Sequence, residues 1–453
     1  MSASALRAPG PSVLALPSLA RRVMRHRLTF FQDMWRTYGD VVRIPFGAEQ
    51  VFLLNDPTHL EHVLLRAHGN YHKSSRINRA RKLVLDECLL TTDGEVWKRQ
   101  RLLAQPAFTR AALSGYVPDM IEVATAELDG WRARVDGPAF DVSAPFVRLA
   151  VRVTGKTLFG SELSEHVETV RTAVHALLAS GAARMSSLLP LPLWIPTGNN
   201  RALRSALRAL DEVVWDVIRR AREEGVEGRS DILARMMTAR DEEGRALTDQ
   251  ELRNQVVNFL TAGYESTAAA LAWTLFLIGQ RPSVQDALAA EVAEVLAGRP
   301  PLEADVKRLE LCGRVIRESM RLYPPAWLFD REAVVDDVVG GYRIPRGAQI
   351  MISPYLLHRH PEHWEDPERF DPDRFLPERV AARHPMAYLP FSKGPRFCVG
   401  EQFSMVEMIL TLALFAQRYR VEVDPQHPVE LLDFMTLRNA HGVQCVLRAA
   451  RSG

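Results

Sequence analysis

The loop Phe391-Ser392-Lys393-Gly394-Pro395-Arg396-Phe397-Cys398-Val399-Gly400 decides how the rest of this chain is interpreted. It places one cysteine between two glycines, directly before a long apolar run. Glycine adopts backbone conformations that other residues avoid, so Gly394 and Gly400 predict a tight loop that a flat ligand can approach closely. Backbone N–H groups and the start of a helix both favour a thiolate, and Cys398 is predicted to lie beside them.

Cys398 has two interpretations on these residues alone. A lone cysteine is most often a small, buried apolar side chain, here in an ordinary glycine turn. The presence of Phe391, Gly394, Arg396 and Gly400 around it favours the second interpretation. In that interpretation a thiolate binds haem iron and donates the electron density that favours O–O cleavage. Arg396, two residues before the sulfur, is then placed to direct its guanidinium at a haem propionate.

The pattern Phe-x-x-Gly-x-Arg-x-Cys-x-Gly at 391–400 resembles the haem-ligand loop of the cytochrome P450 monooxygenases, of the soluble bacterial type. The resemblance implies a mainly α-helical fold with a small β lobe, and haem b between a long central helix and the cysteine loop. It implies one domain over residues 1–453, with an irregular N-terminal entry over about residues 1–27. It also implies that Phe391 contacts the haem and that Cys398 is the iron ligand.

Composition limits the function classes that fit this chain. The 57 basic and 55 acidic residues nearly balance, which gives no support for nucleic-acid binding as the main role. Four widely spaced cysteines show no zinc or disulfide pattern, so a reducing, cytoplasmic location is expected. The apolar run Val13 to Ala20 is broken by Pro17 and is shorter than the roughly 20 residues that span a bilayer. We therefore expect no transmembrane anchor, and a monomer.

A long helix is predicted from Thr248 to Gln280. Thr248-Asp249-Gln250-Glu251 forms a capping box at its start, and Arg281-Pro282 ends it. A glycine in the middle of a helix costs roughly 1 kcal/mol relative to alanine, so Gly263 requires a reason. The bland explanation is a tolerated glycine beside surface polar groups.

The stretch around Gly263 supplies the other explanation. Ala262-Gly263-Tyr264-Glu265-Ser266-Thr267 resembles the oxygen-activating Ala-Gly-x-(Asp/Glu)-Thr-Thr of the family, with Ser266 where threonine is usual. The resemblance implies that Ala262 lies against the haem and that Glu265, Ser266 and Thr267 are catalytic. Ser266 and Thr267 are about 100° apart around a helix, so both cannot face the iron equally. We favour Ser266 because it directly follows Glu265.

Further residues match the family's propionate partners. Trp97 and Arg101 are four apart and share a helix face, where an indole N–H and a guanidinium suit a carboxylate in an apolar cleft. Alone, the pair is more often a packed tryptophan beside a surface arginine. The match to the family's Trp-x-x-x-Arg implies propionate binding, and Arg331 is implied as another propionate partner.

Glu318 and Arg321 are three apart and face together on a helix. The resemblance implies that they form a buried network with Arg374 that holds the haem-loop region in place and takes no part in catalysis. Removing one member of such a network leaves a buried charge without a partner and lowers the free energy of unfolding by about 3–5 kcal/mol.

The expected substrate pocket is largely apolar, which the resemblance links to hydroxylation or epoxidation with O₂. A terpenoid, a fatty acid or a polyketide-like molecule of secondary metabolism is expected. A haem sensor or carrier, or a peroxide-driven enzyme or isomerase on the same fold, is the alternative, and the intact 265–267 run argues against both. The pocket residues are Leu90, Val257, Leu260, Trp327, Leu328, Phe329, Phe434 and Met435.

Electrons are expected from a separate protein. Only 55 residues follow Cys398, too few for a flavin or iron–sulfur domain. A ferredoxin or flavodoxin with its reductase is the expected donor, and a basic face that includes Lys98, Arg99 and Lys393 is expected to steer it.

Overall fold

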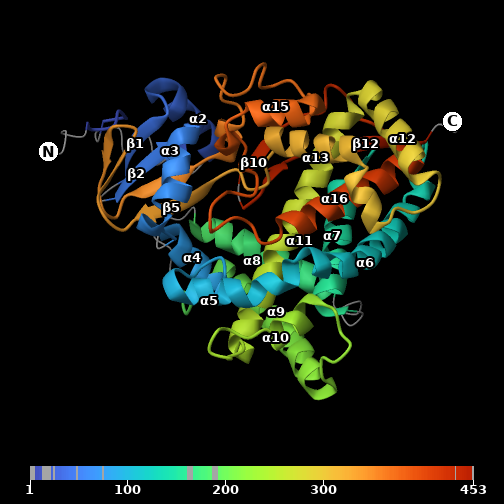
Figure 1. The fold of residues 1–453 in the computed structure, drawn as a ribbon, viewed down its shortest axis with the longest axis horizontal. Coiled ribbons are helices and arrows are strands. Elements are labelled where there is room, and N and C mark those ends of the chain that lie inside the picture. Colours follow the sequence, from blue (N-terminus) through green and yellow to red (C-terminus); the bar gives the residue numbers. More distant parts are fainter. Residues whose placement is uncertain are drawn as a thin grey trace. The chain divides into compact units, whose positions relative to one another are not determined.

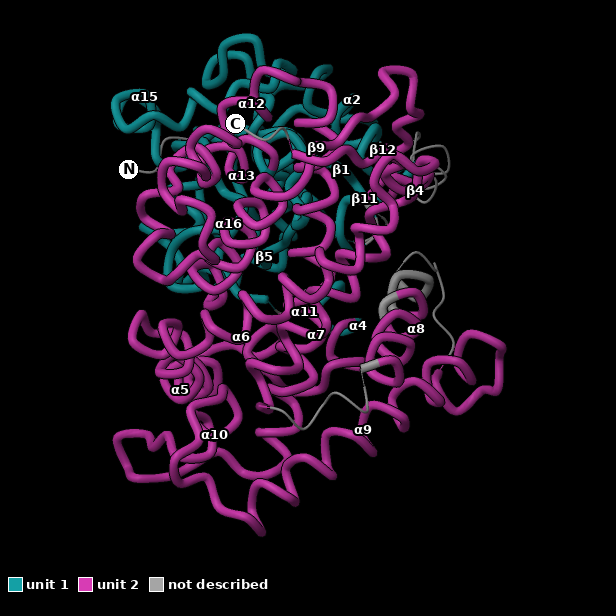
Figure 2. Tube along the Cα trace, turned by 90° about the vertical axis from the view of Figure 1, so that its right-hand side faces the viewer, with its two compact units in different colours: residues 1–80, 320–398, 433–437 teal, residues 81–319, 399–432, 438–453 magenta. Residues whose placement is uncertain are grey.

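The computed structural model describes residues 6–12, 22–23, 26–46, 49–73, 76–160, 167–185, 192–433 and 435–450. The chain divides into two compact units, each assembled from separate segments (Figure 2). Unit 1 takes residues 1–80, 320–398 and 433–437, and unit 2 takes residues 81–319, 399–432 and 438–453. One domain over the whole chain stays a prediction.

Unit 1 is built on a five-stranded sheet in the order β1-β2-β8-β5-β3. Of these strands, β1, β2 and β5 are labelled in Figure 1. β1 and β2 pair antiparallel, with Val41 opposite Leu54. β8 runs parallel to β2 and antiparallel to β5, and all four of its residues are buried, as expected of a central strand. The strands of this sheet are β1 (Val41–Phe46), β2 (Glu49–Leu54), β3 (Tyr71–His72), β5 (Phe329–Ala333) and β8 (Gln349–Ile352).

The rest of unit 1 consists of short elements around that sheet. Asp56 caps the helix that follows β2, because its carboxylate accepts hydrogen bonds from the N–H groups of Thr58 and His59. The helices are α2 (Arg27–Tyr38), α3 (Pro57–Glu61), α14 (Pro354–Leu357) and α15 (Pro377–Ala382), with shorter turns at His62–Arg66, His68–Asn70, Pro372–Phe375 and Pro385–Ala387, and a hairpin of β6 (Asp337–Val339) and β7 (Tyr342–Ile344).

Unit 2 is mainly helical, and α11 (Asp249–Gly279) is its longest element. The predicted capping box is present, since Thr248 and Glu251 each bond the other's backbone N–H. α11 packs along α7 (Ser143–Phe159), beside which it runs in Figure 1. The other helices are α5 (Gly94–Ala104), α6 (Arg110–Asp129), α8 (Val167–Met185), α9 (Gly198–Glu224), α10 (Ile232–Thr238), α12 (Pro282–Leu296) and α16 (Glu401–Arg418), with short turns at Gln105–Phe108, Arg132–Arg134 and Glu303–Lys307.

A three-stranded sheet in the order β4-β12-β9 completes unit 2. Its strands are β4 (Phe140–Asp141), β9 (Tyr419–Glu422) and β12 (Gln444–Ala449). The remaining elements include residues of both units: α4 (Arg76–Leu85), α13 (Glu310–Leu322), β10 (Leu431–Asp433) and β11 (Leu437–Asn439). None of the helices that the structure describes is long and apolar enough to cross a bilayer.

Candidate active site

Cys398 is the one exposed cysteine of the four, whereas Cys88, Cys312 and Cys445 are buried. Burial raises the pKa of the Cys445 thiol to about 12 and that of Cys312 well above its ordinary value, so both stay neutral. The Cys398 N–H donates to the carbonyl of Phe391 at 2.9 Å, which closes the loop on itself. α16 starts at Glu401, three residues after the sulfur, as the sequence predicts.

The two loop glycines have different roles. Gly394 has φ of +78°, and a Cβ there would lie 2.0 Å from the carbonyl oxygen of Leu64, so only glycine fits. Gly400 has φ of −88° and is the N-cap of α16. The expectation that Gly400 also uses glycine's conformational freedom is therefore wrong, because any residue adopts that φ.

A narrow accessible stripe crosses the middle of α11. Every residue from Leu252 to Ile278 is buried except four. The four are spaced i, i+3, i+4 and i+7, which places them on one face of the helix. They are Phe259, Ala262, Gly263 and Ser266. The small side chain of Ala262 on this stripe suits the close approach of a flat cofactor. Separately, an exposed thiol such as that of Cys398 is a suitable iron ligand.

The two candidate hydroxyls differ in their surroundings. Ser266 lies on the stripe, and its hydroxyl donates to the carbonyl of Ala262 at 2.9 Å. Thr267 is 2 % exposed, and its hydroxyl has no hydrogen-bond partner among the described residues. This difference supports Ser266 as the hydroxyl that faces a ligand.

Gly263 has a packing role that the sequence did not indicate. A Cβ at this position would lie 3.3 Å from Oγ1 and 3.6 Å from Cγ2 of Thr154 on α7. The glycine therefore lets α11 and α7 approach closely, in addition to widening the stripe.

Glu265 is 6 % exposed, and its Oε1 lies 3.4 Å from Nη1 of Arg438. Sequence reasoning missed Arg438, because no local pattern connects a strand residue to a carboxylate 173 positions earlier.

The expected propionate partners occur in both units. Trp97 and Arg101 are on α5 of unit 2 and are half-buried. Arg331, on β5 of unit 1, is 4 % exposed and donates to the carbonyl of Asp330 at 2.7 Å. Arg396 is half-buried in the cysteine loop. Their binding of a haem stays a prediction.

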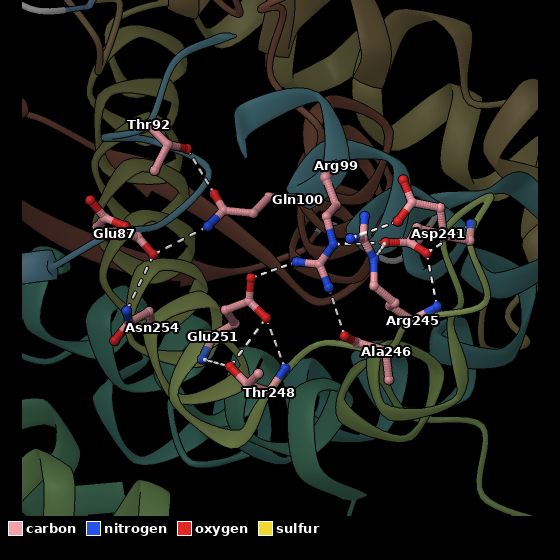
Figure 3. A network of polar contacts seen from close by, with 11 residues as sticks. Glu87, Thr92, Arg99, Gln100, Asp241, Arg245, Ala246, Thr248, Glu251 and Asn254 are labelled. Carbon is pink, nitrogen blue, oxygen red and sulfur yellow. Dashed lines mark hydrogen bonds and ion pairs between the residues drawn. The ribbon is translucent and has the colours of Figure 1, made fainter. Parts of the chain in front are cut away.

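Arg99, between Trp97 and Arg101, is engaged by partners of its own unit (Figure 3). Its Nε donates to Asp241 at 2.8 Å, its Nη1 to Glu251 at 2.5 Å and its Nη2 to the carbonyl of Ala246 at 2.7 Å. The expectation that Arg99 belongs to a docking face is corrected by these contacts. Lys98 stays 63 % exposed beside Glu95, and Lys393 is also exposed.

The segment before α5 is attached to both α5 and α11. The Gln100 amide accepts from the Thr92 hydroxyl at 2.7 Å and donates to the carbonyl of Glu87 at 3.3 Å (Figure 3). Asn254 donates to the same carbonyl at 3.2 Å, and Gln255 accepts from the N–H of Leu89 at 3.1 Å. Leu90, a predicted pocket residue, therefore lies in a segment whose backbone is fixed.

The other predicted pocket residues vary in burial. Val257 and Leu260 are 0 % and 2 % exposed, and Val257 lies opposite the accessible stripe on α11. Trp327 is also buried, whereas Leu90, Leu328, Phe329 and Met435 are half-buried. Phe434 lies outside the described residues. Substrate contact stays a prediction for all eight.

Arg321 is fully buried and binds backbone of the segment that precedes the cysteine loop. It donates to the carbonyls of His358 at 2.9 Å, Pro367 at 2.7 Å and Arg369 at 3.0 Å. Arg374 donates to the carbonyl of Asp366 at 2.9 Å, and Glu318 is 0 % exposed. The contacts of Arg321 and Arg374 are those of structural residues, and a network that joins them to Glu318 stays a prediction.

His358 links this network to the cysteine loop. Burial and then the charge of Arg321 hold its pKa well below the ordinary value, so the ring is neutral. Its Nε2 accepts from the N–H of Leu389, two residues before Phe391, at 2.8 Å. His358 therefore connects the backbone at Arg321 with the backbone just before the cysteine loop.

Comparison with known proteins gives a consistent result. The cytochrome P450 family model matches residues 6–444. A cyclooctatin synthase of Streptomyces melanosporofaciens is 37 % identical over 418 residues, covering 92 % of this chain and 90 % of that protein. A pentalenene oxygenase of Streptomyces avermitilis is 32 % identical over 445 residues, covering 98 % and 97 %. The crystal structure of the cytochrome P450DA heme domain is similar with a TM-score of 0.88 at 27 % identity, covering 99 % of this chain and 98 % of that one.

Proposed function

This chain belongs to the cytochrome P450 family, and from that premise we propose that it hydroxylates or epoxidises a terpenoid with haem b as its cofactor. Membership makes it a haem-dependent monooxygenase that acts on small apolar molecules. Among the substrate classes left open by the sequence, the names of the cyclooctatin synthase and the pentalenene oxygenase support a terpenoid.

The residues that would hold the cofactor are chemically suited to it. Cys398 offers an exposed thiol for the iron, and Trp97, Arg101, Arg331 and Arg396 offer donors for the propionates. When bound, haem supplies the oxidation, in which one oxygen atom of O₂ enters the substrate and the other leaves as water. The chain contributes the ligand, the orientation, the protons and the exclusion of water.

The observation that carries the proposal is the accessible stripe of α11, with Ser266 on it and the acid Glu265 directly before it. A hydroxyl both accepts and donates a proton, so Ser266 Oγ can pass one on. To do so, the Ser266 hydroxyl has to give up its hydrogen bond to the Ala262 carbonyl. Glu265 directly precedes Ser266 and has a buried side chain, which suits it to pass protons from solvent to the serine. A sensor, a carrier or a peroxide-driven enzyme has no need of this acid–hydroxyl pair.

Electron supply is proposed to come from a ferredoxin or flavodoxin with its reductase, acting on a cytoplasmic monomer. Lys98 and Lys393 are exposed and remain candidates for an acidic donor's docking face. Arg99 no longer belongs to that set.

The spectrum of the reduced, CO-bound protein tests the iron ligand. We expect a thiolate-type spectrum in the wild type and its loss in Cys398→Ser. Cys312→Ala, which removes a buried thiol, is the control and keeps the spectrum. A thiolate spectrum in Cys398→Ser would overturn the assignment.

A product screen with a surrogate electron donor tests the reaction. Cyclic terpenes and long-chain fatty acids are offered in parallel, and mono-oxygenated terpene products are expected. Oxidation of the fatty acids alone would refute the substrate class while leaving the enzyme class intact.

A further inference from the structure

Arg438 is held in place by the residue that follows it. Asn439 uses its whole side-chain amide, donating to the carbonyl of Pro428 at 2.9 Å and accepting from the N–H of Glu430 at 3.1 Å. The backbone N–H of Ala440 also donates to the carbonyl of Glu430 at 2.8 Å. Successive strand residues point to opposite faces, so buried Asn439 leaves Arg438 on the other face of β11.

From that position the partly exposed side chain of Arg438 contacts the buried acid of α11, Glu265. Its side chain is 39 % exposed, whereas that of Glu265 is 8 % exposed, and Nη1 and Oε1 are 3.4 Å apart. A buried carboxylate without a cation is costly, so the ion pair holds the Glu265 side chain in one orientation. The Nε of Arg438 is buried and has no hydrogen-bond partner within the described ranges.

Arg171 is a second cation whose charge acts on Tyr264, the residue before Glu265. Burial, and then the charge of Glu265, raise the pKa of the Tyr264 hydroxyl, while Arg438 and Arg171 act in the opposite direction. Arg171 is paired with Glu168, whose Oε2 accepts from its Nε at 2.9 Å. Arg438 therefore forms the only ion pair of Glu265 recorded in the part of the chain that the structure describes.

We propose that Arg438 positions Glu265 for proton delivery. In the closed ion pair, Arg438 holds the Glu265 carboxylate where a proton from solvent can reach it. A guanidinium does not release its proton, so Arg438 is a positioning residue and not a member of the relay. A hydronium ion at the exposed end gives its proton to Glu265 and becomes water, and the neutral carboxyl loses its attraction to Arg438. Glu265 then gives its proton to Ser266 Oγ while the Ser266 hydroxyl releases its own proton to the acceptor on the accessible stripe. Glu265 is then a carboxylate again and closes the pair.

This inference rests on the proposed function, because it assumes that Glu265 delivers protons. It predicts that Arg438→Gln loses about five- to tenfold in product formed per electron consumed, a part of what positioned proton transfer contributes. The solvent deuterium isotope effect on turnover rises. Arg438→Lys restores most of both, because it keeps the cation.

A matched control removes the neighbouring cation. Arg171→Gln, which breaks the pair with Glu168, keeps the wild-type coupling and isotope effect. Equal losses in Arg171→Gln and Arg438→Gln would show a general effect of charge and overturn the proposal.

Urea unfolding of the holoenzyme provides a readout that is independent of turnover. Arg438→Gln and Glu265→Gln each lower the midpoint, and the double variant lowers it by less than the sum, because the two residues share one interaction. Strict additivity would overturn the pair.

The failure of this proposal is separable from failure of the proposed function. If Glu265→Gln leaves coupling unchanged, the relay itself is refuted. If Glu265→Gln uncouples turnover while Arg438→Gln does not, the relay stands and the role of Arg438 is refuted.

Discussion

Arg99 Nη1 donates to Glu251 Oε1 at 2.5 Å, and the other oxygen of Glu251 accepts from the Thr248 N–H at 2.8 Å. The capping box of α11 is thus attached to α5, the helix that carries the predicted propionate partners Trp97 and Arg101 (Figure 3). Asp241 completes the attachment, and hydrogen bonds from Arg99 and from Arg245, side chain and backbone, hold its pKa below the ordinary range against the opposing effect of burial.

Replacing Arg99 should destabilise the protein. Arg99→Ala removes three charge-assisted contacts from a side chain that is 23 % exposed, and we expect a loss of about 2–3 kcal/mol in the free energy of unfolding. Lys98→Ala, at the exposed neighbouring position, is the control and changes stability by less than about 0.5 kcal/mol. Chemical denaturation measures both. Equal effects of the two variants would contradict the network.

The two glycines of the cysteine loop should respond differently to alanine. Gly394→Ala combines a positive φ with a Cβ that meets the Leu64 carbonyl, and we expect a loss of at least about 3 kcal/mol and reduced haem content. Gly400→Ala has an ordinary φ and loses only a glycine N-cap, at about 1 kcal/mol or less. Thermal unfolding and the haem-to-protein ratio check this. Similar haem content in the two variants would refute the close approach to Leu64.

Glu407 should make the stability of the protein fall as pH rises. It is 1 % exposed on α16, neither carboxyl oxygen has a hydrogen-bond partner in the described residues, and burial raises its pKa well above the ordinary value. The unfolded chain ionises this group above about pH 4.5, so the stabilising difference is full below that pH and is lost as pH rises through the folded-state pKa.

Glu407→Gln cannot ionise and avoids this loss. We expect the variant to be more stable than the wild type by about 1–3 kcal/mol at pH 7 and equally stable at pH 4. Urea unfolding at both pH values measures the difference. Glu401→Gln, partly exposed on the same helix, should not change the pH dependence, and a destabilised Glu407→Gln at pH 7 would reveal a partner for the carboxylate.

Ser266 and Thr267 should separate in a test of coupling. Ser266→Ala removes the hydroxyl on the accessible stripe and should lower product per electron several-fold, because positioned proton transfer is lost. Thr267→Val removes a buried hydroxyl without a recorded partner, and we expect unchanged coupling and equal or higher stability. Uncoupling in Thr267→Val with normal Ser266→Ala would reverse the assignment.

The sequence predicted the features that depend on local pattern. The capping box at Thr248 and the end of the long helix before Pro282 follow from spacing and residue type, and the structure confirms them. The cysteine loop could also be predicted, because its glycines and its cysteine lie within ten residues of one another. The conformation of Gly400 was not, because a glycine's φ depends on whether the next helix begins there.

Side-chain partners from distant segments could not be predicted. Arg99 reaches Asp241, 142 residues away, and Arg438 reaches Glu265 across 173 residues. The helix sequence alone predicts that a basic residue such as Arg99 is exposed to solvent, because it does not show whether an acidic loop folds over it. Helix periodicity likewise does not predict that α11 packs against α7. The packing role of Gly263 could therefore not be inferred from the sequence.

The attachment of residues 87–92 has a consequence for redesign of this enzyme. The bonds that fix this segment come from Gln100, Asn254, Gln255 and Thr92, so the apolar side chain of Leu90 makes none of them. We therefore expect substitutions of the Leu90 side chain to leave these bonds in place. Directed evolution of substrate preference should tolerate many residues at position 90 and few at positions 254 and 255.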